Sequence, residues 1–185
     1  MRRSWTGEMP TRMASGLRGD PAIADPLAPS AVNEMPSPLA GVRLLEVRPS
    51  AIHGDGVFAL HGLPPGWRVG AYEGRRYSPH EMRERPEDGP VTYAFGLSDG
   101  TLIDAARGGN ATRHINHSCE PNCQAQEQMD DDGELGIVIR TRRRIRAGEE
   151  LSIDYRLDIG SDDPANYACR CGAANCRGTM AWLMS

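Results

Sequence analysis

Short runs of apolar and β-branched residues, each bounded by glycine, proline or polar turn residues, recur along the chain from residue 42 onwards. Runs of this length are typical of strands and too short for most α-helices. They predict a mainly β fold, with strands over residues 42–47, 68–74, 92–97, 101–104, 134–141 and 151–155. The Ser98-Asp99-Gly100 segment between two of these runs predicts a hairpin turn.

Two short helices are expected beside the strands. Ser78, Pro79 and Glu81 form a capping box with proline at the first helical position, and this helix ends before Pro86. Asn110 is placed to cap a second helix that runs to about residue 113.

The first part of the chain shows neither the period of a strand nor that of a helix. Residues 1–38 are rich in Pro, Ser, Met, Ala and Gly and cannot bury enough apolar area to offset their ordering entropy. We therefore expect a disordered segment over 1–38, a folded domain over 39–157 and a tail over 158–185. The tail opens with an acidic linker rich in Gly, Ser and Pro.

Apolar residues make up 39% of the 185 residues, which is enough for one hydrophobic core. No apolar run approaches the roughly 18 residues of a membrane-spanning helix. No apolar segment follows the N-terminal arginines, so a secretory signal is not expected. A soluble, cytoplasmic protein without a membrane partner is therefore predicted.

All 21 basic residues are arginine, as is common in GC-rich genomes, and the net charge is −4. This charge argues against direct nucleic-acid binding, which needs a basic face. It is compatible with a lysine- or arginine-rich peptide as partner. The arginine-rich run at 142–146 is interpreted as a solvated strand edge, where charge discourages unwanted pairing.

Two polar motifs organise the second half of the chain. One is Asn-His-Ser-Cys-Glu-Pro-Asn-Cys at 116–123, whose amide, imidazole, hydroxyl and thiol groups need specific partners wherever they are buried. The other is Gly-Glu-Glu-Leu-Ser-Ile-Asp-Tyr at 148–155, a turn leading into a short strand. With Arg-His-Ile at 113–115, the pair resembles the signature motifs of SET-domain protein-lysine methyltransferases. The resemblance covers residues 42 to 178.

The resemblance is closest to trithorax-like histone methyltransferases with a post-SET zinc tail. It implies transfer of a methyl group from S-adenosylmethionine to a lysine side-chain amine in a protein substrate, a histone tail being one candidate. It also implies the SET fold of small curved sheets, short helices and a knot-like C-terminal crossing, a topology that spacing alone does not show. Small size without reader domains, and a composition without lysine, favour a bacterial member.

The resemblance also implies a cofactor loop around Asp55. Gly54 and Gly56 flank this residue before a β-rich run, and on their own they indicate no more than a tight turn. Beside the two motifs, the segment is similar to the loop that cradles S-adenosylmethionine in the family. The implied cofactor contacts are His53, Gly54, Asp55, Gly56, Tyr93, Asn116, His117 and Arg170. His114 is given no catalytic role and is interpreted as a packed, neutral imidazole.

Tyr155 is the residue that the resemblance implies for catalysis. A lysine amine has a pKa of about 10.4 in water, so it must lose a proton before it can accept a methyl group. Desolvation beside a cationic sulfonium favours that loss, and a tyrosine hydroxyl can then orient the amine. Without the preceding Gly-Glu-Glu-Leu, the hydroxyl would be explained as the cap of a buried strand.

The substrate channel is implied at Tyr72, Phe95 and Ile153. Tyr72 equally fits an amphipathic strand, with its ring in the core and its hydroxyl in water. Ile153 occupies a position where the family often has phenylalanine or tyrosine, so the number of methyl groups transferred is left open.

The chain holds five cysteines, which in a chain without a signal peptide indicate metal binding before disulfides. Cys169, Cys171 and Cys176 suit one tetrahedral zinc ion but leave one ligand missing. The resemblance supplies the fourth ligand, Cys119, so that zinc joins the tail to the first motif and couples metal binding to the site. Cys123 is left as a structural thiol.

A second class of function stays open, namely a catalytically weak SET module that acts as a zinc-stabilised protein-interaction domain. The presence of Tyr155 and of the Asn116-His117 pair favours the enzyme. A zinc-stapled nucleic-acid binder is disfavoured by the net charge and by the lack of an aromatic and basic stripe. The residues leave open the substrate protein, the target lysine, the oligomeric state and export to a host nucleus.

Overall fold

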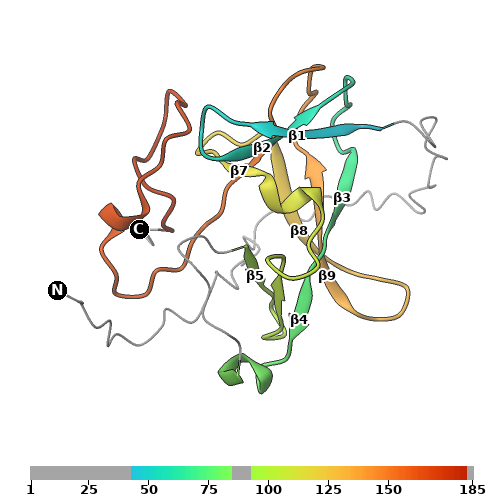
Figure 1. Cartoon of the computed structure of the whole chain (residues 1–185), viewed down its shortest axis with the longest axis vertical. Helices are drawn as coiled ribbons and strands as arrows, with labels where there is room; N and C mark the ends of the chain where they lie inside the picture. Colours follow the sequence, from blue (N-terminus) through green and yellow to red (C-terminus); the bar gives the residue numbers. More distant parts are fainter. Residues whose placement is uncertain (1–42, 85–92, 183–185) are drawn as a thin grey trace, which may run out of the picture.

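The computed structural model describes residues 43–84 and 93–182. These residues form ten short strands in four small sheets, with three single-turn 3₁₀ helices, so the prediction of a mainly β fold is confirmed (Figure 1). The strands are β1 (Leu45–Pro49), β2 (Asp55–Ala59), β3 (Arg68–Tyr72), β4 (Arg75–Tyr77), β5 (Ala94–Gly96), β6 (Leu102–Asp104), β7 (Asn116–His117), β8 (Cys123–Met129), β9 (Leu135–Thr141) and β10 (Ser152–Ile153). The helices are η1 (Glu81–Glu84), η2 (Ala111–His114) and η3 (Pro164–Tyr167).

The longest strands form the antiparallel sheet β3-β9-β8, in which β9 is the central strand. β9 is paired along both edges, and its middle residues Ile137, Val138 and Ile139 are buried. The strand β8 was not predicted from the sequence, although its three glutamines alternate with Cys123, Ala125 and Met129, and only Glu127 breaks the apolar series. A second antiparallel sheet has the order β4-β6-β5, and β1 pairs with β2.

Both predicted side-chain caps are confirmed, although η1 begins at Glu81, two residues after the predicted first helical residue Pro79. The backbone N–H of Ser78 donates to Glu81 Oε2 at 2.9 Å, and the backbone N–H of Glu81 donates to Ser78 Oγ at 3.4 Å. This reciprocal pair is the capping box that precedes η1. Asn110 Oδ1 accepts from the backbone N–H of Thr112 at 3.0 Å at the start of η2.

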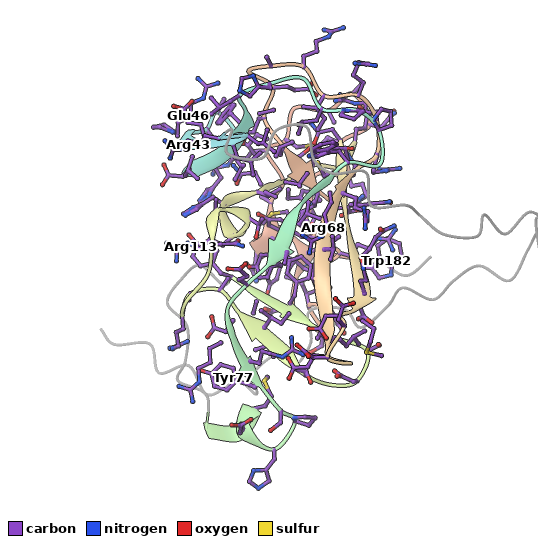
Figure 2. All side chains as sticks on the ribbon, turned by 90° about the vertical axis from the view of Figure 1, so that its right-hand side faces the viewer. Arg43, Glu46, Arg68, Tyr77, Arg113 and Trp182 are labelled. Carbon is purple, nitrogen blue, oxygen red and sulfur yellow. The ribbon has the colours of Figure 1, made fainter. Side chains whose placement is uncertain are left out.

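The core is built from aliphatic side chains, as expected of a chain with two phenylalanines. Its members with at most 1% exposure are Val57, Ala59, Leu63, Leu97, Ala105, Ile115, Cys123, Ile139, Ile145 and Leu151. A smaller cluster of Tyr77, Ala94 and Leu102 lies at the opposite end from β1, where Figure 2 labels Tyr77 far below Arg43 and Glu46. The larger core includes Ile115, Leu151 and Ile153, so it packs directly against the two polar motifs.

Several predicted strands are shorter than expected or displaced. The runs 42–47 and 151–155 correspond to β1, which continues to Pro49, and to β10, which has only two residues. The predicted disordered segment 1–38 lies outside the described residues. Among the described residues, no helix is long and apolar enough to cross a membrane.

The arginine-rich run also differs in one residue from the prediction of a solvated edge. Arg142, Arg143 and Arg144 are exposed, whereas Ile145 is fully buried and forms an antiparallel bridge with Leu63. The run is therefore anchored to the core through its one apolar side chain.

The tail after β10 folds back onto itself and onto the chain that follows the second motif. Leu157 bridges Ala181 in parallel, and Ala168 bridges Thr179 antiparallel. Asp163 caps η3 by accepting from the backbone N–H of Ala165 at 2.9 Å, within the segment interpreted from sequence as a linker. Figure 1 shows this tail beside the strands that carry the two motifs.

Candidate active site and metal centre

The two polar motifs meet as a parallel pair of very short strands. In β7 and β10, Asn116 lies opposite Ser152 and His117 lies opposite Ile153, and all four residues are at most 7% exposed. The pairing continues where the backbone N–H of Ser118 donates to the carbonyl of Ile153 at 3.0 Å. The sequence separation is more than thirty residues, so this contact fixes the centre of the site.

Asn116 ties the first motif to the loop before β2. Its side-chain amide nitrogen donates to the carbonyl oxygens of His53 and Asp55, both at 3.1 Å, and to Glu150 Oε1 at 2.9 Å. The Glu150 carboxylate also accepts from Ser50 Oγ at 2.7 Å. One buried amide therefore holds both ends of the loop predicted to carry the cofactor.

His117 is held in one tautomer by its neighbours. The backbone N–H of Tyr155 donates to His117 Nδ1 at 3.1 Å, so the neutral ring carries its proton on Nε2. His117 Nε2 faces Cys119 Sγ at 3.5 Å. Burial lowers the pKa of His117, against the opposing effect of the nearby Asp154 carboxylate. The imidazole is thus a neutral link between Tyr155 and the cysteine cluster.

A cavity of about 640 Å³ opens beside this strand pair. Its volume falls within the range of about 300–1,000 Å³ found for small-molecule sites. Eleven of the residues assigned to cofactor, channel and catalysis line it: His53, Gly54, Asp55, Tyr72, Tyr93, Phe95, Asn116, His117, Ile153, Tyr155 and Arg170.

Gly56 is the one predicted cofactor residue that does not line the cavity. It is buried, and a Cβ atom built on it would collide with the Glu150 carboxylate. Gly54 differs, since it has a φ of +47° and open space beside it. The two glycines therefore differ in role. Gly56 leaves room for the Glu150 carboxylate, and Gly54 lies in the lining of the cavity.

Further residues line the cavity without having been assigned to it from sequence. Arg113 and His114 come from η2, and Asn166, Tyr167 and Met180 come from the tail. Arg113 stacks over the ring of Tyr93, and burial together with Arg113 lowers the pKa of His114. The two η2 residues adjoin the first motif and could be found by that adjacency, whereas the tail residues carry no local signal.

Tyr155 is the last residue of the second motif and lines the cavity. Its hydroxyl donates to the carbonyl of Ile115 at 2.8 Å. Burial raises the pKa of Tyr155, and the neighbouring Tyr93 and Glu150 add to the effect. Burial raises the pKa of Tyr72 as well, and the Tyr72 ring packs edge-on against Phe95 at 4.6 Å. Both hydroxyls are therefore neutral hydrogen-bonding groups near neutral pH.

A second cavity of about 340 Å³ shares the side chains of Phe95 and Tyr155 with the first. It extends between β5, which contributes Gly96, and β8, which contributes residues 123–127. Both strands are edges of their sheets, so each presents unpaired backbone groups. The two aromatic residues thus border a large cavity on one side and an open-edged groove on the other.

Four cysteines from distant parts of the chain form a cluster: Cys119, Cys169, Cys171 and Cys176. Their sulfur atoms all lie within 4.8 Å of one another, and Cys119 Sγ is 3.8 Å from Cys169 Sγ and 4.0 Å from Cys176 Sγ. Tetrahedral zinc with bonds of about 2.3 Å places its sulfurs about 3.8 Å apart. Cys123 is fully buried outside the cluster, and burial raises the pKa of its thiol to about 12.

Each clustered sulfur accepts at least one backbone N–H. The donors to Cys119, Cys169, Cys171 and Cys176 are, in that order, the N–H groups of Arg177 at 3.3 Å, Cys171 at 3.4 Å, Cys119 at 3.5 Å and Gly178 at 3.4 Å. Burial opposes ionisation of Cys171, but the N–H of Cys119 and further hydrogen bonds outweigh it and lower its pKa to about 6. Burial raises the pKa values of Cys119 and Cys169, and the N–H donors to their sulfurs oppose that rise. Zinc requires thiolates as ligands.

A buried polar strand pair, a tyrosine that lines two cavities and a cluster of four sulfurs thus lie together in this part of the molecule. The family model described as "SET domain" matches residues 54–156. The chain therefore belongs to the SET-domain family, which confirms the resemblance found in the sequence. The tail lies beyond the matched residues, so its post-SET zinc character stays a prediction. The bacterial source also stays a prediction.

Curated relatives agree with this membership. The human protein "Histone-lysine N-methyltransferase 2B" is 42% identical over 133 residues, which are 69% of this chain and 5% of that protein. The "Histone-lysine N-methyltransferase, H3 lysine-4 specific" of Saccharomyces cerevisiae is 39% identical over 136 residues, 71% of this chain and 12% of that protein. "Histone-lysine N-methyltransferase trithorax" of Drosophila virilis is 39% identical over 132 residues, which are 69% of this chain and 3% of that protein. The chain thus spans a small part of the length of these relatives.

Proposed function

We propose that this protein transfers a methyl group from S-adenosylmethionine to the side-chain amine of a lysine in a protein substrate. The observation that carries the proposal is the position of Tyr155, which lines both cavities and is held through its backbone N–H by His117. A neutral hydroxyl at this junction can meet a group that enters from the groove and face a ligand in the larger cavity.

The residues of the larger cavity fit a nucleoside cofactor with a cationic centre. The carbonyls of His53 and Asp55 are fixed by Asn116, and the open space at Gly54 leaves the loop accessible to a ligand. Arg170 and Tyr93 line the same cavity from the tail and from the chain before β5. When bound there, S-adenosylmethionine supplies the methyl group.

Tyr155 and its surroundings act on the incoming amine. The lysine ammonium loses its proton before reaction, and burial between Phe95 and Tyr155 favours the neutral amine by desolvation. Tyr155 is itself oriented by donating to the Ile115 carbonyl. Alignment of reacting groups in such a channel is worth up to about 7–11 kcal/mol where preorganisation is complete. Ile153 closes the cavity with an apolar side chain next to Tyr155.

For the substrate, the proposal is a lysine-bearing peptide that lies in the groove between β5 and β8. Edge strands bind extended peptides by adding a strand, with main-chain hydrogen bonds for affinity and side-chain pockets for specificity. The relatives described above are named histone-lysine methyltransferases, and a histone-like tail is therefore the first substrate class to test.

The cysteine cluster is proposed to hold one zinc ion. The four sulfur positions and their N–H donors fit a structural thiolate site. The cluster joins the first motif at Cys119 to the tail, and tail residues line the cofactor cavity. Metal binding would therefore stabilise the wall of the cavity that the tail provides.

Titration calorimetry of S-adenosylmethionine into the zinc-loaded protein tests the proposal. Binding is expected in the wild type and is expected to weaken in chelator-treated protein. A labelled-methyl assay on histone-tail peptides, with lysine-to-arginine peptides as matched controls, then tests transfer. If the folded, zinc-loaded protein binds no S-adenosylmethionine, the methyltransferase proposal is wrong and a zinc-stabilised protein-interaction module is the better account.

A further inference from the structure

Arg177 follows the last of the four clustered cysteines and contacts both the cluster and the second motif. Its backbone N–H donates to Cys119 Sγ at 3.3 Å. Its guanidinium donates to both carboxylate oxygens of Asp154, at 2.7 and 3.0 Å. A two-point pair of this kind fixes orientation as well as distance, so Arg177 links the tail to the residue before Tyr155 in a defined geometry.

Asp154 in turn shapes the turn that presents Tyr155. Its Oδ1 accepts from the backbone N–H of Arg156 at 3.3 Å and lies 3.6 Å from His117 Nδ1. Arg156 has a φ of 46° and is the one non-glycine residue in the described part of the chain with a positive φ. Such a backbone conformation persists only where the surroundings hold it. The Asp154 carboxylate is the group that bonds this turn to Arg177.

We propose that Arg177 is a positioning residue that couples the cysteine cluster to the Tyr155 turn, so that an ordered, metal-loaded tail strengthens cofactor binding through the Arg177–Asp154 pair. The proposal rests on the proposed function, because the cofactor cavity is the one that Tyr155, His117 and the tail line together. In the described part of the tail, Arg177 is the residue whose side chain pairs with an acidic group of this turn.

A purely structural role for Arg177 makes a different prediction. Side chains of the pair are 35% and 17% exposed, and partly exposed ion pairs add little to global stability. Coupling therefore predicts a change in cofactor affinity with little change in unfolding or zinc content. A role confined to the tail predicts the reverse, with loss of zinc and of stability and an unchanged affinity in the protein that is saturated with zinc.

The test compares Arg177→Gln and Arg177→Lys in zinc-loaded protein by titration calorimetry with S-adenosylmethionine. Arg177→Gln is expected to retain one zinc per chain and to bind about tenfold more weakly, since the charged two-point contact is lost. Arg177→Lys keeps the charge without the planar guanidinium. Its affinity for S-adenosylmethionine is expected to lie between those of the wild type and Arg177→Gln. The double variant Arg177→Gln, Asp154→Asn is expected to bind S-adenosylmethionine no more weakly than either single variant, because the two residues act as one unit.

Arg143→Gln is the matched control, because Arg143 forms an equally short ion pair with Glu149 outside the tail. This variant is expected to leave cofactor affinity unchanged. Zinc release to a colorimetric chelator gives a readout independent of activity: S-adenosylmethionine should slow release from the wild type and not from Arg177→Gln. Equal affinities and equal release in the two proteins would overturn the coupling alone. A wild type that binds no S-adenosylmethionine would overturn the coupling and the proposed function together.

Discussion

The side-chain amide of Asn116 donates to the backbone carbonyl of Asp55 at 3.1 Å, across 61 residues of sequence. The same nitrogen reaches the carbonyl of His53 and the carboxylate of Glu150. The first motif therefore holds the loop at residues 53–55 by its backbone carbonyls. This explains how a loop whose side chains are exposed keeps a fixed shape.

Replacing Asn116 with alanine should destabilise the protein and loosen the cofactor loop. The variant leaves the carbonyls of His53 and Asp55 without their donor, a loss worth about 1–3 kcal/mol where such groups are buried. Denaturant unfolding measures the stability, and titration calorimetry measures the affinity for S-adenosylmethionine, which is expected to fall about fivefold or more by the same estimate.

Asn122→Ala is the matched control for that prediction. Asn122 is 3% exposed, donates to Glu149 Oε1 at 3.1 Å and to the Glu150 carbonyl at 2.7 Å, and lines neither cavity. Its loss should destabilise the fold by a similar amount but leave the affinity of the folded protein nearly unchanged. Equal loss of affinity in both variants would show that general destabilisation, and not the loop, is responsible.

Gly56→Ala is expected to destabilise the protein although Gly56 lies outside the cavity. The new methyl group would displace the Glu150 carboxylate, which accepts from both Ser50 and Asn116. Overpacking of this kind costs about 1–3 kcal/mol. If Glu150 is the cause, the same substitution should cost clearly less in a Glu150→Ala background, as a double-mutant cycle by chemical denaturation would measure. An unchanged cost would assign the effect to another contact.

Tyr155→Phe should abolish most methyl transfer while the cofactor still binds. The change removes the hydroxyl at the junction of the two cavities and its bond to Ile115, and leaves the ring and the backbone bond to His117 in place. Loss of alignment predicts a fall in kcat of about 10²-fold or more. Single-turnover rates measure it, and calorimetry should show cofactor affinity within about threefold of the wild type, below the value of one ordinary hydrogen bond. A variant with full activity would remove Tyr155 from the mechanism.

Much of the site was predictable because its signals are local. The two polar motifs, the Asn110 cap and the three tail cysteines each stand in a few consecutive residues, and the roles of the motif residues came from their resemblance to the SET family. The strand β8 was missed because its series of Cys123, Ala125, Glu127 and Met129 holds no β-branched or aromatic residue, although its glutamines keep the period of a strand. Tyr167 and Arg177 were missed for a different reason, since they reach the site only when the tail folds back, and no local pattern encodes that return.

The cysteine cluster predicts one zinc per chain, with Cys123 playing no part in binding. Cys119→Ser removes one of the four clustered sulfurs and should lower zinc content and the affinity for S-adenosylmethionine together. Cys123→Ala should keep the zinc, because the sulfur is buried outside the cluster. Elemental analysis of purified protein after dialysis measures the stoichiometry. Full zinc content in Cys119→Ser would contradict the proposed ligand set.

The raised pKa of Tyr155 sets the behaviour of the protein in alkali. A tyrosine in an unfolded chain ionises near pH 10, and burial moves the pKa of Tyr155 above that value in the folded state. The folded state therefore binds its proton more tightly, and the stability from this group is present below about pH 10 and is lost as the pH rises further. Tyr155→Phe should lose less stability than the wild type between about pH 9 and 11, measured by chemical denaturation. Phenolate absorbance in the near ultraviolet should be the same in both folded proteins up to about pH 10; a smaller signal in the variant would mean that Tyr155 ionises normally and that its hydroxyl is open to water.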